Sequence, residues 1–230
     1  MQLIQVPYSH NCVKVRRALE LKGLDYRTLD IPPTDRTAVR KASGQGQVPV
    51  LLDKGETIVD STRILAYLEQ RYPQPSLLPE DRSLHADCWM LEDWADLGFM
   101  ALTRRIAYWE ICRTPGALGG LFFPRQTGWQ LKLREYIAKQ IVRKRFGLSA
   151  AQDRDDQQEL ARLAAIAVAR LNGQPFLFGG RVSVADIALA TMSAPAWISP
   201  MARKPSHLRT LLEWGRPIVG TETLTLYRAP

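Results

Sequence analysis

The first seventy residues alternate short apolar runs with segments whose apolar positions recur at helical spacing. Runs of strand length cover residues 3–6, 26–29, 49–53 and 57–60. The last two runs flank Lys54-Gly55-Glu56, a break that indicates a hairpin. Helices are predicted over residues 13–21, more weakly over 35–42, and again from residue 61 onward. The order β-α-β-α-β-β-α predicts a mixed sheet covered by helices.

After residue 72 the pattern changes to helical periodicity alone. The Pro-rich residues 73–79 mark the change. We therefore expect one domain over residues 1–74 and an all-helical domain over residues 81–230. In the second region we predict a long helix over 81–112 interrupted near Gly98, a breaker-rich loop over 114–120, a basic helix over 127–146, and helices over 153–171, from Ser183 and over 205–214.

Composition is that of an ordinary globular protein, with 46% hydrophobic and 23% charged residues among 230. No apolar run approaches the roughly 18 residues that span a bilayer, and the N-terminus lacks a secretory pattern. We expect a cytoplasmic protein with no membrane span. The three cysteines form an odd set without metal-ligand spacing, so we expect a reducing compartment and no metal.

The formal net charge of +8 raises the question of anionic partners. Basic and apolar residues alternate over residues 131–145 as in an amphipathic helix. We interpret this segment as a solvated face or a subunit edge, and an anionic partner is the alternative. No nucleic-acid motif accompanies it, so we expect no nucleic acid. The same charge would steer a small anionic ligand toward the protein.

The pairs Val48-Pro49 and Asp60-Ser61 are the most informative residues in the chain. A Val-Pro step between a loop and a strand is a candidate cis peptide bond. We expect such a bond to turn the N–H and C=O of Val48 outward, toward an extended peptide. Asp60 can accept from an amine, and a helix beginning at Ser61 offers unpaired N–H groups to a carboxylate. Together these groups fit a small zwitterionic peptide.

Three segments, in this order along the chain, resemble the cytosolic glutathione transferase superfamily. They are the strand-to-helix turn and first helix within residues 8–26, the Val-Pro and Asp-Ser pairs, and residues 176–186, which are similar to the family's helical capping motif. The resemblance implies an α/β thioredoxin-like domain with a mixed four-stranded sheet, followed by an all-α domain. It also implies glutathione as co-substrate, a role in detoxification and a homodimer. Residues 80–174 match only in being helical.

Ser9 is our first candidate for the catalytic residue. A free thiol has a pKa of about 8.5, so catalysis must favour its thiolate. A hydroxyl donor and a helix N-terminus aimed at the sulfur both do so. In the resemblance, Ser9 lies where theta- and zeta-like members carry serine. The alternative is that Ser9 serves only as a helix N-cap.

Cys12 and Tyr8 lie in the same turn. Cys12 completes a Ser-x-x-Cys motif, and we expect the helix terminus to lower its pKa, which would suit a mixed disulfide with glutathione. The alternative for Cys12 is a structural thiol. Tyr8 is expected to form a wall of the glutathione pocket, with donation from its phenol to the sulfur as the alternative.

The remaining site residues follow from the resemblance. It places Asp60 and Ser61 on the γ-glutamyl amine and carboxylate; a strand-end acid plus an N-cap is the alternative. Gln47 is a candidate for the glycine carboxylate, beside the backbone of Val48-Pro49, with Arg40 and Lys41 as further candidates. Tyr108 and Phe122 are expected to contact the second substrate. Ser183 and Asp186 form a capping box, which we interpret as structural.

Three functions are compatible with these patterns. The leading hypothesis is a glutathione transferase that conjugates the glutathione thiolate to a small apolar electrophile. A Cys12-dependent glutathione thiol transferase is the second. The third is a non-catalytic binding protein of the same fold, whose partner would lie on the basic face within residues 114–148.

Overall fold

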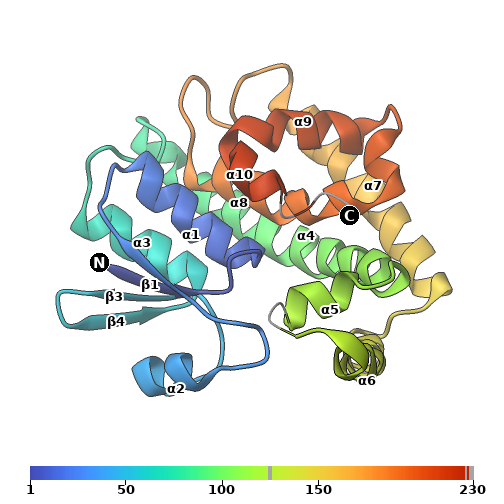
Figure 1. Ribbon diagram of the computed structural model, residues 1–230. Coiled ribbons are helices and arrows are strands. Elements are labelled where there is room, and N and C mark those ends of the chain that lie inside the picture. Colours follow the sequence, from blue (N-terminus) through green and yellow to red (C-terminus); the bar gives the residue numbers. More distant parts are fainter. Residues whose placement is uncertain (124–125, 226, 228–230) are drawn as a thin grey trace.

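The structure is a computed structural model that describes residues 1–123, 126–225 and 227 (Figure 1). Its N-terminal part contains four strands: β1 (Gln2–Gln5), β2 (Arg27–Asp30), β3 (Val50–Asp53) and β4 (Glu56–Val59). They form one sheet in the order β2-β1-β3-β4. Strands β1 and β2 are parallel, whereas β3 is antiparallel to both β1 and β4. The predicted mixed sheet and its hairpin are therefore confirmed.

Helices cover both faces of this sheet. Side chains alternate along a strand, so Leu3 joins the apolar cluster that contains residues of α1 (His10–Leu21) and α3 (Ser61–Arg71). Its neighbour Ile4 packs on the opposite face with Val39 of α2 (Thr37–Ser43). This is the predicted thioredoxin-like arrangement, and it places the start of α1 at the end of β1.

The remainder of the described chain is helical. It consists of α4 (His85–Arg113), α5 (Ala117–Phe122), α6 (Gly128–Phe146), α7 (Ala150–Leu171), α8 (Val184–Ser193), α9 (His207–Val219), α10 (Thr221–Thr225) and the short 3-10 helices Arg82–Leu84, Ala194–Ile198 and Pro200–Arg203. In the described parts of the chain, none of the helices has the length and apolar character that crossing a membrane requires.

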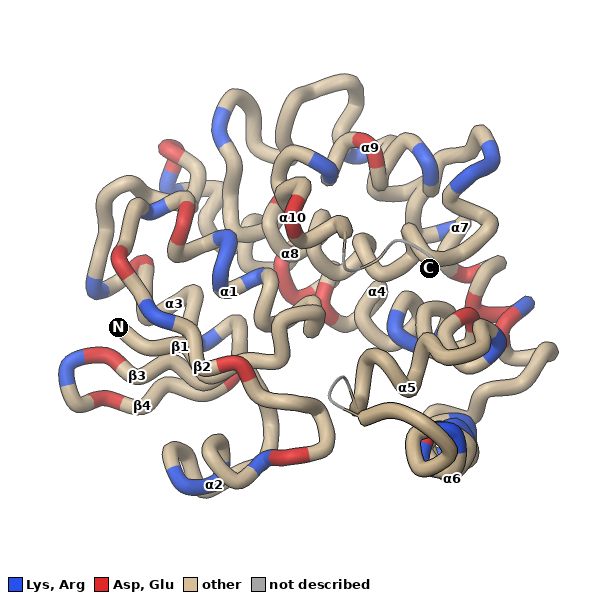
Figure 2. The backbone as a smooth tube through the Cα atoms, viewed as in Figure 1, with Lys and Arg blue, Asp and Glu red and all other residues tan. Residues whose placement is uncertain are grey.

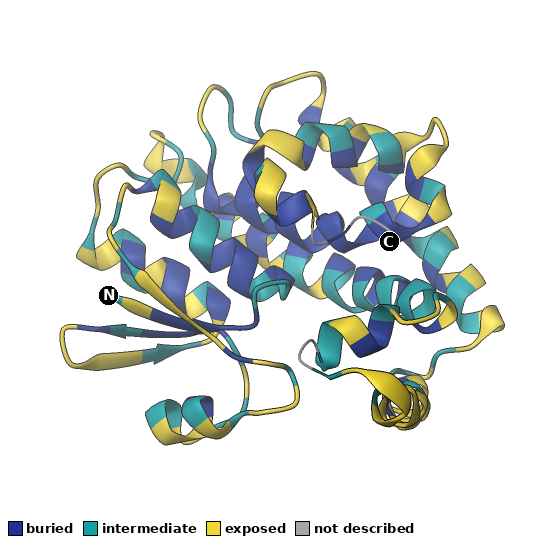
Figure 3. Ribbon diagram, viewed as in Figure 1, coloured by how far each residue is buried: buried dark blue, intermediate teal, exposed yellow. Residues whose placement is uncertain are grey.

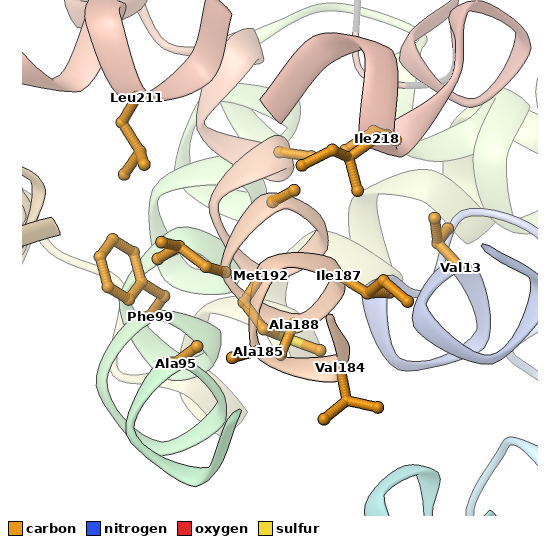
Figure 4. Close-up of a cluster of buried hydrophobic side chains, with 14 of the residues drawn as sticks. Val13, Ala95, Phe99, Val184, Ala185, Ile187, Ala188, Met192, Leu211 and Ile218 are labelled. Carbon is orange, nitrogen blue, oxygen red and sulfur yellow. The ribbon is translucent and has the colours of Figure 1, made fainter. Parts of the chain in front are cut away.

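Helix α8 forms the centre of the helical part. All ten of its residues are buried, as expected of a helix that is apolar on every side. Figure 4 shows its Ile187 and Met192 pointing toward α1 and α4, respectively, with Leu211 and Ile218 of α9 above them. The predicted capping box opens this helix: Asp186 Oδ2 accepts from the backbone N–H of Ser183 at 2.8 Å, and the Ser183 hydroxyl accepts from the Asp186 N–H.

Two predicted interruptions in the helical part are wrong. Helix α4 continues through Gly98, where the buried residues Ala95, Phe99 and Leu102 keep one face of the helix in the core. This burial offsets the roughly 1 kcal/mol that a glycine costs inside a helix. The segment expected to be a loop contains α5, in which Gly119 lies so close to α6 that a Cβ there would be 3.1 Å from Glu135 Oε2. The glycine permits close packing there.

The last predicted helix also differs from the structure. Helix α9 does not end at Trp214 but runs to Val219, and α10 follows it. Pro217 lies inside α9 and removes one backbone donor. Ile218 and Val219 remain buried beyond it, so tertiary packing extends the helix past a residue that usually ends one.

Helix α6 is the predicted basic helix. It buries only Glu135, Ala138 and Val142, and the rest of it is largely exposed (Figure 3). Its last turn carries three consecutive basic residues, Arg143, Lys144 and Arg145. Figure 2 views α6 nearly end-on and shows several basic positions on it in blue. A solvated face, the first of the two interpretations, agrees with this exposure.

Candidate functional site

A cleft of about 670 Å³ separates the N-terminal sheet region from the helical part. The turn after β1 and the loop before β3 line one side, and α4, α5 and α6 line the other. Seven residues singled out from the sequence line this cleft together: Tyr8, Ser9, Arg40, Gln47, Val48, Tyr108 and Phe122. The structure thus brings side chains from opposite halves of the chain to one site, and their individual roles remain predictions.

Ser9 occupies the N-cap position of α1 but does not use its hydroxyl for capping. Its backbone is extended, with φ −70° and ψ 120°, and its side chain makes no capping hydrogen bond. The backbone C=O instead accepts from the Val13 N–H at 2.8 Å. The half-buried hydroxyl is therefore not used for capping and can donate to a ligand atom held at the helix N-terminus.

Cys12 lies in the protein interior. Its side chain has no exposed surface and does not line the cleft. Burial raises the pKa of the Cys12 thiol to about 11, although the Val6 backbone and the Ser9 side chain act to lower it. The lowered pKa expected from the sequence is therefore wrong, because the loss of hydration outweighs the effect of the helix terminus.

The loop before β3 presents peptide backbone to the cleft. The Val48-Pro49 peptide bond is cis, which confirms the sequence-based expectation. The Gln45 side chain holds Gln47 by accepting from its N–H and donating to its C=O. No described residue makes a hydrogen bond to the N–H or C=O of Val48, which lines the cleft. These two groups are free to pair with an extended peptide.

Asp60 and Ser61 do not line the cleft, but they lie at the same end of the sheet as Val48. The β3–β4 register pairs Val50 with Val59, and extending it by two residues sets Val48 opposite Ser61. Asp60 is the N-cap of α3, and its Oδ1 accepts from the Arg63 N–H at 3.1 Å. The capping bond uses one carboxylate oxygen only.

The backbone of Asp60 is strained. Its φ of 75° lies in a region that residues with a Cβ rarely occupy. Such a conformation costs on the order of 1–3 kcal/mol and is found most often at ligand-binding sites. The strain agrees with the predicted ligand role of Asp60, which the capping bond does not exclude.

The aromatic wall of the cleft is built by ring contacts between helices. Tyr108 of α4 stacks on Phe146 of α6 with centroids 4.9 Å apart, and Phe122 of α5 meets Tyr108 edge-on at 6.4 Å. Tyr8 faces the same group, and its hydroxyl is buried without a partner among the described residues. Burial raises the pKa values of both Tyr8 and Tyr108, so both phenols are neutral donors at pH 7.

Several further residues line the cleft. His10 is buried, and this burial, with the charges of Arg104 and Lys14, lowers its pKa to about 3. The Tyr227 hydroxyl donates to the Tyr8 C=O at 2.8 Å and holds Tyr227 against the site. Arginines 36, 40, 104 and 145 line the cleft, and the sequence had indicated only Arg40. No local pattern distinguishes these arginines from surface ones. The described residues contain no group of three or more His, Cys, Asp or Glu that could hold a metal.

Comparison with known proteins gives strong matches to the N-terminal part. Residues 3–76 match the family model described as glutathione S-transferase, N-terminal domain. Among curated proteins, the chain is 41% identical over 88 residues to maleylacetoacetate isomerase of Pseudomonas aeruginosa, covering 35% of this chain and 42% of that protein. It is 40% identical over 72 residues to the zeta class glutathione S-transferase of Euphorbia esula, covering 30% and 32%. The matches thus span less than half of these relatives.

Solved structures match over nearly the whole chain. The theta class glutathione S-transferase of Xanthomonas axonopodis pv. citri, solved with glutathione bound, has a TM-score of 0.67 and 25% identity, covering 95% of this chain and 94% of that one. The beta-etherase LigF of Sphingobium has a TM-score of 0.72 at 21% identity, covering 97% and 98%, a likeness of fold alone. These neighbours share the architecture of a thioredoxin-like domain followed by helices.

Proposed function

Because the chain belongs to the cytosolic glutathione transferase superfamily, we propose that it is a glutathione-dependent transferase whose Ser9 stabilises the glutathione thiolate. The observation that carries this proposal is the placement of Ser9. Its hydroxyl lies in the cleft at the N-terminus of α1, and no capping bond occupies it. A donor and a helix N-terminus at one point favour the charged form of a thiol placed there.

Glutathione would bind along the loop that precedes β3. The free N–H and C=O of Val48 pair with its extended backbone, and Gln47 lies toward its glycine carboxylate. The γ-glutamyl amine lies at Asp60, and its carboxylate lies at Ser61, the first residue of α3. The antiparallel register supports this assignment because it brings the Asp-Ser and Val-Pro pairs to the same sheet end.

The second substrate would occupy the aromatic side of the cleft. Tyr108, Phe122 and Phe146 give it an apolar wall that suits the apolar body of an electrophile. The glutathione sulfur attacks the electrophilic carbon, a C–S bond forms, and the leaving group departs with the electrons of its broken bond. The thiol proton has passed to solvent before this step.

The test follows the thiolate directly. Glutathione is titrated into the protein near neutral pH while the ultraviolet absorbance of the thiolate is recorded. We expect a saturable signal for the natural protein and its loss in Ser9→Ala. The matched control is Ser149→Ala, because Ser149 caps α7 with its hydroxyl and lies outside the cleft. Absence of both signal and binding heat in the natural protein would refute the proposal.

A second reaction is favoured by one observation, the 41% identity of the N-terminal part to a maleylacetoacetate isomerase. Isomerisation and conjugation are distinguished by mass balance. An isomerisation at this site would leave the amount of glutathione unchanged, whereas a conjugation consumes one glutathione per product. Free thiol is therefore measured before and after complete turnover of maleylacetoacetate or an aryl halide.

The resemblance also supports three broader features: a homodimer, a cytoplasmic location with a role in detoxification, and a domain division into residues 1–74 and 81–230. Light scattering of the purified protein tests the dimer. Limited proteolysis tests the division, since cleavage is expected first in the proline-rich connector between the two parts.

A further inference from the structure

The charge of the cleft goes beyond what a site for apolar compounds needs. Of the residues that the structure describes, four arginines line it, at positions 36, 40, 104 and 145, and none of these lining residues is Asp or Glu. Among the described residues, none of the four forms an ion pair with a carboxylate. An unbalanced group of guanidinium groups facing one cleft attracts an anion.

Two of these arginines converge on one ring from different helices. The guanidinium of Arg104 on α4 lies 5.2 Å from the centroid of the Phe146 ring, and that of Arg145 on α6 lies 5.8 Å from it. Phe146 in turn stacks on Tyr108. Two like charges held at one aromatic ring repel each other, and a shared anion relieves that repulsion.

Unpartnered donors point to the same conclusion. Arg104 Nε, Arg36 Nη1 and the Tyr8 hydroxyl are buried, and none of them has a hydrogen-bond partner among the described residues. Buried donors are almost always satisfied in folded proteins. All three belong to residues that line the cleft. Burial lowers the pKa of Arg104, and the neighbouring charges of Arg105 and Arg145 lower it further.

The arginines divide between the two substrates. Arg40 lies on the glutathione side of the cleft. Its guanidinium group packs near Gly46, where a Cβ would be 3.8 Å from two of its nitrogens. Gly46 directly precedes Gln47 and Val48. Arg104 and Arg145 come from the opposite wall, beside the aromatic residues Tyr108 and Phe146. Their position is that of the second substrate.

We propose that Arg104 and Arg145 form an anion subsite that selects aromatic electrophiles carrying a carboxylate. The aromatic body lies on Tyr108 and Phe146, and the carboxylate accepts hydrogen bonds from the two guanidinium groups. Arg fits a carboxylate with two parallel bonds, which gives direction as well as charge. This inference rests on the proposed function and narrows its second substrate from apolar compounds to amphipathic acids.

The chemistry needs no further reactant. In 4-chloro-3-nitrobenzoate the thiolate attacks the carbon that bears chlorine, a C–S bond forms, the C–Cl bond breaks and chloride leaves. The carboxylate opposite the reacting carbon stays unchanged and remains on the subsite. The neutral partner of this compound is 4-chloro-3-nitrobenzamide, which has nearly the same shape.

The decisive experiment measures binding, so that intrinsic reactivity does not enter. Calorimetry compares the two glutathione conjugates of these compounds, which differ only in carboxylate against carboxamide, and glutathione itself. We expect the natural protein to bind the carboxylate conjugate about 10-fold or more tightly than the carboxamide, because charge-assisted hydrogen bonds are the strong ones. Arg104→Gln and Arg145→Gln each reduce this ratio severalfold and leave the affinity for glutathione unchanged.

The matched control is Lys144→Gln. Lys144 is exposed, adjoins Arg145 on α6 and does not line the cleft, so its removal changes the net charge equally. We expect the carboxylate-to-carboxamide ratio to stay within about twofold in this variant, since an exposed charge outside the cleft is screened by water and salt. Arg145 is itself exposed, so Arg145→Gln tests the subsite without disturbing the core.

The outcomes separate the two proposals. Normal glutathione binding with equal affinity for both conjugates would overturn the subsite alone. An equal loss of affinity for glutathione and for the carboxylate conjugate in Arg104→Gln and Arg145→Gln would assign these arginines to glutathione, which also overturns it. No binding of glutathione by the natural protein would overturn the proposed function and the subsite with it.

Discussion

Lys14 Nζ lies 2.5 Å from Glu92 Oε1, and neither side chain has any exposed surface. Asp96 Oδ2 is 2.7 Å from the same ammonium group, and Glu92 also accepts from the Thr62 hydroxyl at 3.0 Å. Lys14 and Thr62 belong to the helices beside the sheet, α1 and α3, whereas the two carboxylates belong to α4. This cluster therefore joins the N-terminal part to the helical part. Its member Thr62 directly follows the Asp60-Ser61 pair in the chain.

Removal of Lys14 is expected to destabilise the protein strongly. Lys14→Met leaves the buried Glu92 and the partly buried Asp96 without a cation, and breaking a buried pair in this way costs about 3–5 kcal/mol. Burial already raises the pKa values of both carboxyls. A folded state that prefers protonated carboxyls loses stability as pH rises, so the deficit is larger at pH 7 than at pH 5. Denaturant unfolding at both pH values measures it.

Glu92→Gln is the matched control for Lys14→Met. It keeps the shape of the side chain and leaves one lysine with one carboxylate, so we expect a change of about 1 kcal/mol or less, in the range of a net neutral hydrogen bond. Equal losses in the two variants would contradict the view that uncompensated charge dominates at this cluster.

His10 is expected to make the protein sensitive to acid. Its pKa is lowered from 6.5 to about 3 by burial, so below pH 6.5 the unfolded chain binds a proton that the folded chain does not. Stability contributed by neutral His10 is present above pH 6.5 and is lost as pH falls toward 3. By pH 5 the loss is about 2 kcal/mol, at 1.36 kcal/mol per pH unit. Unfolding free energies of the natural protein and His10→Asn between pH 7 and 4.5 measure it.

The diagnostic quantity is the difference between these two pH profiles. Carboxyl groups contribute to both proteins and cancel in the comparison. We expect the His10→Asn profile to be flatter over this range, and parallel profiles would show that the imidazole becomes protonated without unfolding.

Cys12 is expected to be dispensable for conjugation. Its buried thiol is protonated at neutral pH, so Cys12→Ala should keep most of the natural kcat/KM. Ser9→Ala should lower kcat/KM by a factor of about 10 or more, because it removes one hydrogen-bond donor from the glutathione thiolate. Steady-state conjugation rates of both variants provide the measurement. Loss of activity in Cys12→Ala with a silent Ser9→Ala would instead favour the thiol transferase.

Asp186 is expected to act on folding and not on catalysis. Its carboxylate is buried and accepts from the Leu177 N–H at 2.8 Å and from the Ser183 hydroxyl at 2.6 Å, in addition to the capping bond. Asp186→Ala leaves these buried donors unsatisfied at about 1–3 kcal/mol each, so we expect a total loss of roughly 3 kcal/mol or more. Thermal and denaturant unfolding measure the loss, and the KM for glutathione of the folded fraction should not change.

Asp81→Ala is the matched control for Asp186→Ala. Asp81 makes similar bonds to the N–H and hydroxyl of Ser83 but is exposed, so water replaces the lost partner. We expect a cost of about 1 kcal/mol or less, as for an ordinary cap. A cost equal to that of Asp186→Ala would mean that burial is not what makes the Asp186 cap important.

The sequence by itself determined the features that depend on a few neighbouring residues. Short apolar runs and helical patterns predicted the four strands and the mixed sheet, and the Lys54-Gly55-Glu56 break predicted the hairpin. The spacing of Ser183 and Asp186 predicted the capping box. A capping bond or a turn joins residues three or four apart, so its chemistry can be recognised in a short segment of sequence.

Only the tertiary structure decided which side chains meet and how far they are from water. Burial raises the pKa of Cys12, although its position in the first turn of a helix would lower it. Gly119 lies inside α5 because it packs closely on α6, and Gly98 lies inside α4 because its neighbours are buried in the core. Arg104 and Arg145 share one aromatic ring because α4 and α6 pack against each other, a relation that spacing along the chain does not encode. Solvation and long-range contact are properties of the assembled fold, and they bring arginines that are dispersed in the sequence into one cleft.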